Sequence, residues 1–139
     1  MIMIKEMTLL LLFPVLAFIG CSEDAVTNPV GGGFGNNGGG SVTFTVTAVA
    51  NQAQGTTNFE FYPSVDVTVT SIIVSVPAQN FTYTENNPNP SEVFTAAGGF
   101  QITDYQGVAS GQQWTFQVQG HIGNANGQAF DVTVNYTIP

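Results

Sequence analysis

The sequence predicts an all-β domain over residues 41–139, built as an antiparallel β-sandwich of seven or eight short strands. Apolar and polar residues alternate with a period of two along most of this region, which is typical of strands with one buried face. Clusters of Gly, Asn and Pro separate the alternating runs, as turns do. No window of comparable length shows the 3.6-residue apolar repeat of an amphipathic helix. About 99 residues form one domain with a modest single core.

The alternation is clearest at the two ends of the domain. Near the start, Val42, Phe44, Val46 and Ala48 alternate with threonines, and near the end the apolar set is Phe130, Val132, Val134, Tyr136 and Ile138. The intermediate apolar sets are Phe59/Phe61, Val65/Val67/Val69, Ile72/Val74/Val76, Phe81/Tyr83, Phe100/Ile102 and Trp114/Phe116/Val118. These runs give the expected strands, and we expect Trp114 to fill a core position.

The buried positions change from odd to even numbers across Thr70-Ser71. Because a shift of one residue swaps the two faces of a strand, a bulge, kink or turn is expected there. A strand that crosses from one sheet to the other would use such a break.

Turn signals mark the ends of the strands. They are Ala53-Gln54-Gly55, the cluster from Asn86 to Pro90, Gly98-Gly99, Gln106-Gly107 and the segment from Gly123 to Gly127. We expect the last of these to join the Trp114 strand to the Phe130 strand as a hairpin. In that hairpin Asn126-Gly127 would supply the positive φ angles.

In length and strand pattern, the domain resembles the immunoglobulin-like and fibronectin-type modules of bacterial surface proteins. The resemblance covers residues 41–139 and implies an immunoglobulin-like sandwich. The cysteine pair of antibody domains is absent, since the chain has a single cysteine, Cys21. Stability must therefore come from the aromatic and β-branched core, without a disulfide within the chain.

The first residues have the pattern of a signal peptide. Lys5 precedes an apolar run from Met7 to Ile19, which ends at Gly20 and Cys21. A helix of about 13 residues spans about 20 Å, which is short of the roughly 30 Å hydrocarbon core of a bilayer. The run therefore predicts a signal peptide, residues 1–20, instead of a membrane span.

The end of this run, Phe18-Ile19-Gly20-Cys21, resembles the lipobox of bacterial lipoproteins, although Phe18 replaces the usual Leu. The resemblance implies cleavage between Gly20 and Cys21 and attachment of acyl chains such as palmitate to Cys21. Two or more chains, at about 0.8 kcal/mol per buried methylene, would anchor the protein stably. The following Ser22-Glu23-Asp24 resembles the acidic export signal of Bacteroidetes lipoproteins. It implies display on the outer face of the outer membrane, with a periplasmic orientation as the alternative.

Residues 21–40 are expected to be the lipidated cysteine and a flexible tether. The stretch from Ala25 to Gly40 is dominated by Gly and Asn and has no apolar periodicity, so it cannot offset the entropy of ordering. A Gly-rich coil of this length has a mean reach of roughly 25 Å. Such a tether would lift the domain clear of the lipid headgroups.

The charge balance excludes some partners. The chain has one Lys or Arg against nine Asp and Glu, and that cation, Lys5, lies in the predicted signal peptide. Nucleic-acid binding needs cations that neutralise phosphates, so we expect no nucleic-acid partner. Attraction to anionic lipid is excluded for the same reason. The membrane would be reached through the acyl chains alone.

The candidates for catalysis and metal binding are few. His121 is the only histidine, and a Ser-His-Asp arrangement would have to recruit Asp104 or Asp131. A solvated histidine at a strand end is the simpler account. Zinc lacks ligands at the right spacing. A calcium ion bound in a loop stays open, although no D-x-[DN]-x-[DN]-G motif is present and Asp66 and Asp131 fall at polar positions of the alternation.

Sugar binding is the most specific alternative. Carbohydrate modules on sandwiches use exposed aromatic rings for stacking and Asn, Gln and Asp for contacts with hydroxyls. Tyr62 and Tyr105 lie near expected strand ends and are the candidate ligand-contact residues, whereas Tyr83 and Tyr136 share the alternation of buried neighbours.

The sequence therefore predicts a non-enzymatic surface lipoprotein with no cofactor beyond the lipid on Cys21. Its sandwich would serve as a structural or adhesive module with a glycan or protein partner. The alternatives are a carbohydrate-binding module and a subunit of an outer-membrane assembly, which would show an exposed apolar patch or an unprotected edge strand.

Overall fold

The computed structural model describes residues 41–139, which form eight strands and one 3₁₀ turn. The strands are β1 (Phe44–Asn51), β2 (Thr56–Pro63), β3 (Val67–Val76), β4 (Phe81–Asn86), β5 (Val93–Phe94), β6 (Phe100–Tyr105), β7 (Gln113–Ile122) and β8 (Ala129–Thr137), and η1 (Pro77–Gln79) joins β3 to β4. The predicted signal peptide, cleavage site, lipidated cysteine, export signal and tether, at residues 1–40, lie outside the described residues. Within residues 41–139 no helix has the length and apolar character to cross a membrane.

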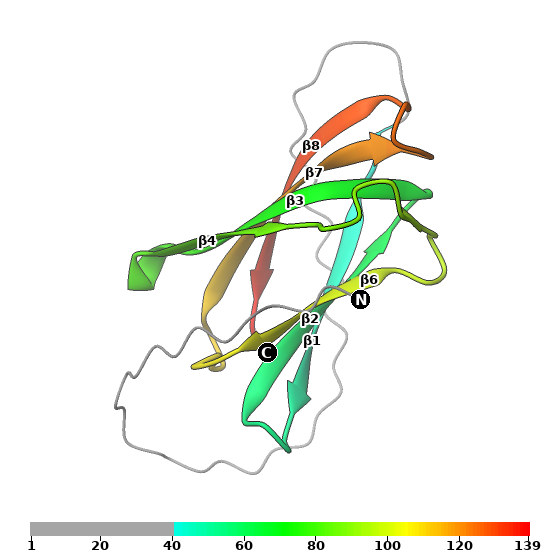
Figure 1. The fold of residues 1–139 in the computed structure, drawn as a ribbon. Helices are drawn as coiled ribbons and strands as arrows, with labels where there is room; N and C mark the ends of the chain where they lie inside the picture. Colours follow the sequence, from blue (N-terminus) through cyan, green and yellow to red (C-terminus); the bar gives the residue numbers. More distant parts are fainter. Residues whose placement is uncertain (1–40) are drawn as a thin grey trace.

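The strands form two antiparallel sheets that pack face to face (Figure 1). The smaller sheet has the order β1-β2-β6, and the larger has the order β4-β3-β7-β8 with β5 beside β3. The chain changes sheet between β2 and β3, between β5 and β6, and between β6 and β7. This is the predicted antiparallel β-sandwich, with eight strands.

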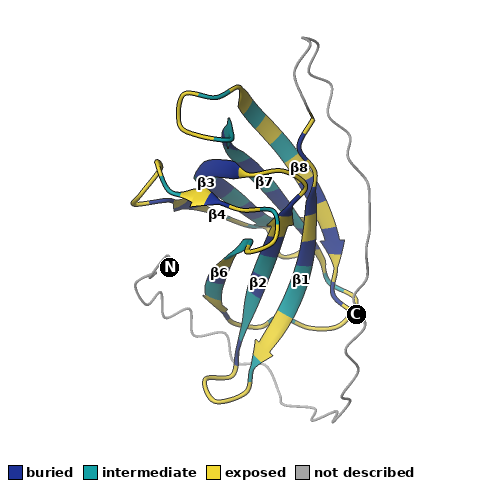
Figure 2. Ribbon diagram, turned by 90° about the vertical axis from the view of Figure 1, so that its right-hand side faces the viewer, coloured by how far each residue is buried: buried dark blue, intermediate teal, exposed yellow. Residues whose placement is uncertain are grey.

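The inner faces of both sheets supply one core. Buried and exposed residues alternate along the strands, as the sequence predicts (Figure 2). Phe59 and Phe61 of β2 and Phe116 of β7 are fully enclosed, and Trp114 is 3% exposed, which confirms its predicted core position. The Phe59 ring lies 4.8 Å from the Trp114 ring and 4.9 Å from the Phe116 ring, between centroids. The core is therefore an aromatic cluster that joins the two sheets.

A bulge interrupts the pairing of β3 with β7 at Thr70, where the sequence predicts a break. Val69 pairs with Gly120 and Ser71 pairs with Gln119, so one extra residue sits on β3. The bulge turns both Val69 and Ile72 into the core. β3 stays in one sheet on both sides of the bulge, so the expectation that a strand changes sheet here is wrong.

Asn87, which follows β4, holds this bulge. Its side-chain amide donates to the Val69 carbonyl over 2.8 Å, and its backbone N–H donates to the Thr70 carbonyl over 2.9 Å. Asn87 is buried, and its Oδ1 accepts a hydrogen bond from the backbone of Asn89. The irregular backbone of β3 thus finds hydrogen-bond partners in the turn after β4.

We expect Asn87→Ala to lower the free energy of unfolding by about 1–3 kcal/mol, because the buried Val69 carbonyl loses its amide donor. Urea unfolding of the purified chain measures this change. Asn89→Ala is the matched control, since Asn89 is exposed and takes part through its backbone, and it should change stability by less than about 0.5 kcal/mol. Equal losses in the two variants would contradict this role of Asn87.

A second bulge, in β6, decides where Tyr105 points. Between Phe59 and Thr57 the β2 strand advances by two residues, while β6 advances by three, from Ile102 to Tyr105. The additional residue is accommodated at Asp104, which has a φ of 71° and whose N–H donates to the Asn58 side chain. Ile102 and Tyr105 therefore both face the core.

The β7–β8 hairpin is present as predicted, but its geometry differs. Gly123 has the positive φ, at 76°, whereas Asn126 and Gly127 do not. Gly127 is needed for another reason, because a Cβ there would lie 1.8 Å from the Ile122 carbonyl oxygen. Val65 also differs from the predicted alternation: it precedes β3 and is 39% exposed.

The backbone of β3 lies unusually close to Gly120 of β7. A Cβ on this residue would lie 1.9 Å from the Thr68 carbonyl oxygen and 3.0 Å from Cζ of Phe130. The missing side chain lets the two central strands of the larger sheet come together beside the bulge, with the Phe130 ring close to the glycine.

Candidate functional site

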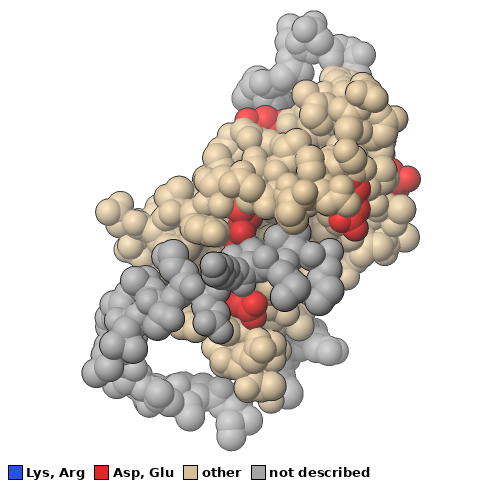
Figure 3. All heavy atoms as spheres, in the orientation of Figure 1, with Lys and Arg blue, Asp and Glu red and all other residues tan. Residues whose placement is uncertain are grey.

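Carboxylates are the only fully charged side chains on the described domain. Residues 41–139 hold Glu60, Asp66, Glu85, Glu92, Asp104 and Asp131, and no Lys or Arg. Those that are visible from the side drawn in Figure 3 appear as separate red groups. No group of three or more His, Cys, Asp or Glu side chains placed to hold a metal ion occurs within this part of the chain.

The residues of the considered Ser-His-Asp arrangement are not joined in the described domain. His121 lies at the end of β7, in the larger sheet, and Asp104 lies in the smaller sheet, where it accepts a hydrogen bond from Thr103. The His121 ring is half-buried, and its Nδ1 atom has no hydrogen-bond partner among residues 41–139. His121 therefore lies at a strand end, as expected, but it is only partly solvated, because its Nδ1 atom is buried.

Asp131 belongs to a network of polar side chains on the outer face of the larger sheet. Nε2 of Gln117 donates to both carboxylate oxygens of Asp131, over 2.9 and 3.0 Å, and Nε2 of Gln119 donates to Oδ2 over 3.0 Å. Ser71 in turn donates to Oε1 of Gln119. In this network two amides and a hydroxyl bond with one another and with the Asp131 carboxylate. Asp66 lies apart from this network. Its Oδ1 accepts a hydrogen bond from the backbone N–H of Ala96, which connects the loop before β3 with the loop after β5.

Glu85 and Tyr105 form a buried polar pair between the sheets. The Tyr105 hydroxyl donates to Oε1 of Glu85 over 2.8 Å, and the two residues are 8% and 5% exposed. Burial raises the pKa of Glu85, while the hydrogen bond from Tyr105 opposes that rise. Burial, followed by the nearby Glu85 charge, also raises the pKa of Tyr105. The prediction of Tyr105 as an exposed ligand-contact ring is wrong, because the bulge at Asp104 turns this ring into the core.

This pair predicts a pH dependence of stability. Because the pKa of Glu85 is raised in the folded state, its contribution to stability is complete below its ordinary value of 4.5 and is lost as pH rises through the raised value. We expect the difference in unfolding free energy between Glu85→Gln and the unsubstituted protein to shift in favour of the variant as pH rises over that range. Urea unfolding at a series of pH values measures it. Parallel profiles would contradict the raised pKa.

Tyr62 is the aromatic residue that the smaller sheet presents to solvent. Tyr62 is 38% exposed, and its hydroxyl donates to Oε2 of Glu60 over 2.9 Å. This hydrogen bond, followed by the charge of Glu60 and by burial, raises the pKa of Tyr62. A Cβ added to Gly99 would lie 2.9 Å from Cδ1 of Tyr62, so the ring rests against the glycine backbone. The predicted exposure of Tyr62 is confirmed.

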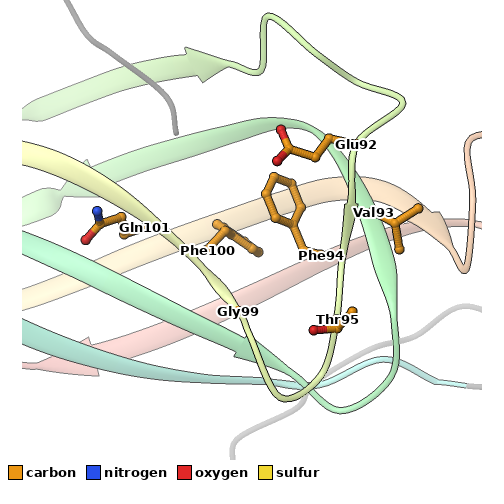
Figure 4. A pocket seen from close by; sticks show the side chains of 7 residues that line it. All are labelled: Glu92, Val93, Phe94, Thr95, Gly99, Phe100 and Gln101. Carbon is orange, nitrogen blue, oxygen red and sulfur yellow. The ribbon is translucent and has the colours of Figure 1, made fainter.

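An open groove of about 460 Å³ begins at the same glycine. Its lining comes from β5, β6 and the turn between them: Glu92, Val93, Phe94, Thr95, Gly99, Phe100 and Gln101. Figure 4 shows the Phe94 and Phe100 side chains between Gln101 on one side and Glu92 on the other. The two rings lie 4.9 Å apart. The groove thus borders two rings that pack into the core, Phe94 and Phe100, and its polar lining residues are Glu92, Thr95 and Gln101.

Glu60, Gln101 and Thr47 form one row beside Tyr62. Glu60 of β2 pairs with Thr47 of β1 and with Gln101 of β6, so the three side chains lie across the outer face of the smaller sheet. Thr45 is the cross-strand partner of Tyr62. The exposed ring therefore has a carboxylate, an amide and hydroxyls within reach.

Among the residues of this surface, the sequence indicated only Tyr62. Gly99 was assigned as a turn glycine, and Glu60 and Gln101 carried no signal, because their proximity depends on the β2–β6 register. Comparison with known proteins finds no matching family model, no matching curated protein and no matching solved structure.

Proposed function

We propose that this protein is a non-enzymatic surface lipoprotein whose sandwich domain is a structural or adhesive module. Acyl chains on Cys21 would anchor it in the bacterial outer membrane, and residues 21–40 would hold the domain away from the lipid. The observation that carries the proposal is the lipobox-like Phe18-Ile19-Gly20-Cys21, placed before a Gly/Asn-rich stretch and a single folded domain.

The arrangement of the described domain supports the non-enzymatic part. His121, the only histidine of the chain, lies near the end of β7 in the larger sheet, while the Tyr62 surface belongs to the smaller sheet. The buried carboxylate, Glu85, is bonded to Tyr105 between the sheets. Neither His121 nor Glu85 belongs to the Tyr62 surface, and this separation supports a role in recognition for that surface.

Localisation is tested by two measurements on the protein from its native host. The intact mass should equal residues 21–139 plus acyl chains. Treatment of whole cells with a protease of broad specificity should remove the domain; trypsin is unsuitable because no Lys or Arg follows Lys5. An unmodified chain would refute the lipid anchor. A modified chain that survives until the outer membrane is broken would refute surface display and favour the periplasmic orientation.

A further inference from the structure

We infer that the outer face of the smaller sheet around Tyr62, together with the adjoining groove, is a binding site for a neutral oligosaccharide. This inference names a ligand for the proposed surface domain. It rests on the proposed function only for the expectation that binding occurs at the cell surface. The site is defined by Tyr62, Glu60, Gln101, Gly99 and the groove lined by Phe94 and Phe100.

The Tyr62 ring has the geometry of a stacking platform. Gly99 lets the backbone support one side of the ring, and the hydrogen bond to Glu60 fixes the hydroxyl end. Gly99 has a φ of 58°, a conformation that other residues adopt at a cost, so the turn itself is shaped to bring its backbone under the ring. A ring held in this way loses little entropy on binding, and it offers an apolar surface to the C–H face of a sugar.

Hydrogen-bonding groups surround this platform in the way a hydroxyl-rich ligand requires. Glu60 keeps one carboxylate oxygen beyond the atom that accepts from Tyr62, and Gln101 and Thr47 flank it across the strands. Gln101 also lines the groove, so this residue borders both the platform and the groove. A sugar unit stacked on Tyr62 would thus find both donors and acceptors.

The groove gives the site its length. It continues from Gly99 along Phe100 and Phe94 to Glu92, whose carboxylate lies at the far end (Figure 4). Its volume of about 460 Å³ lies within the range of small-molecule pockets. An oligosaccharide with one unit on Tyr62 could extend past Gln101 toward the groove, so a short chain fits this surface better than a single sugar.

Charge selects a neutral ligand. Residues 41–139 hold carboxylates and no Lys or Arg, and Glu60 and Glu92 lie at the site itself. An anionic polymer would bring like charges together at both ends of the site. A neutral glycan accepts hydrogen bonds from amides and hydroxyls and donates its own hydroxyls to the two carboxylates without that cost.

The test is affinity electrophoresis of the full-length protein, solubilised in a detergent without a sugar headgroup, through gels that contain a neutral glucan, xylan, mannan or galactan. We expect retardation by at least one of them. Tyr62→Ala should weaken that binding by about tenfold or more, because an anchoring ring is removed. Tyr62→Phe should retain most of it, since the ring stays. Gels with alginate, an anionic polymer, should cause no retardation.

Val49→Ala is the matched control. Val49 is an exposed side chain of the same sheet, at 40%, and it lies outside the defined site, so binding should be unchanged. Equal mobility in all neutral gels and in sugar-free gels would overturn the inference, as would retention by alginate alone or undiminished binding by Tyr62→Ala. The lipid anchor and surface display are tested separately, by intact mass and protease accessibility. A negative result for glycan binding would therefore not refute the lipoprotein proposal.

Discussion

Gly120→Ala should lower the free energy of unfolding by about 3 kcal/mol or more, a large part of the about 5–15 kcal/mol that stabilises a typical domain. The added Cβ would lie 1.9 Å from the Thr68 carbonyl oxygen, which belongs to the backbone of the neighbouring strand. Backbone cannot swing aside as the end of a long side chain can. To make room, β3 and β7 must separate at the bulge, and the pairing at the centre of the larger sheet weakens.

The measurement is urea unfolding of the purified chain, with Gly107→Ala as the control. Gly107 has a φ of 70° but nothing within 4 Å of an added Cβ, so its substitution should cost only the about 1–2 kcal/mol of the left-handed backbone. Gly120 has no positive φ, and its loss is due to the close approach alone. If Gly107→Ala were the more damaging change, the close approach would not limit stability.

Phe59→Ala is expected to cost about 3–5 kcal/mol, as large-to-small changes of buried aromatic residues do. Phe59 is fully buried, and its ring contacts those of Trp114, Phe116, Tyr105 and Tyr136, which come from both sheets. The change removes apolar burial and leaves a cavity between rigid rings that cannot collapse fully.

Thermal and urea unfolding of the same protein preparation measure the loss at Phe59. Phe59→Leu should cost less, because it keeps most of the apolar volume while losing the ring contacts. Val49→Ala, at an exposed position of the smaller sheet, should stay within about 0.5 kcal/mol. A loss at Phe59 no larger than at Val49 would mean that the aromatic cluster does not dominate stability.

The strands could be predicted because their alternation is nearly unbroken. From Val42 to Val46 and from Val134 to Ile138 the odd–even pattern of the sequence matches the buried positions. The bulge at Thr70 was also predictable, because apolar runs of opposite parity flank it. Only the step from this break to a change of sheet failed, since parity reports which face a side chain takes and carries no information on which sheet follows.

The second bulge was missed because one side of it gives little signal. After Ile102 the next apolar residue is Tyr105, and the two residues between them are polar. The sequence therefore does not distinguish a regular strand end from a bulge. Asp104 tolerates a positive φ better than most residues, but this preference is weak. The buried Glu85, by contrast, shares parity with Phe81 and Tyr83, so the sequence did contain a sign of its burial.

The Tyr62 surface could be predicted only in part. Tyr62 was identified as an exposed aromatic residue, but its neighbours come from segments separated by about forty residues. Their meeting depends on the pairing of β2 with β6 and on the backbone conformation at Gly99. The sequence of a single segment predicts neither the strand register nor the contact between a glycine and an aromatic ring.

The position of Trp114 gives this protein an internal optical probe. Trp114 is the only tryptophan of the chain, it is 3% exposed, and the Tyr105 ring lies 5.6 Å away, between centroids. Its indole N–H donates to the side chain of Gln112, which immediately precedes β7. Fluorescence excited at the indole therefore comes from one site between the sheets. A shift of its emission to longer wavelength reports water reaching that site, with no label attached.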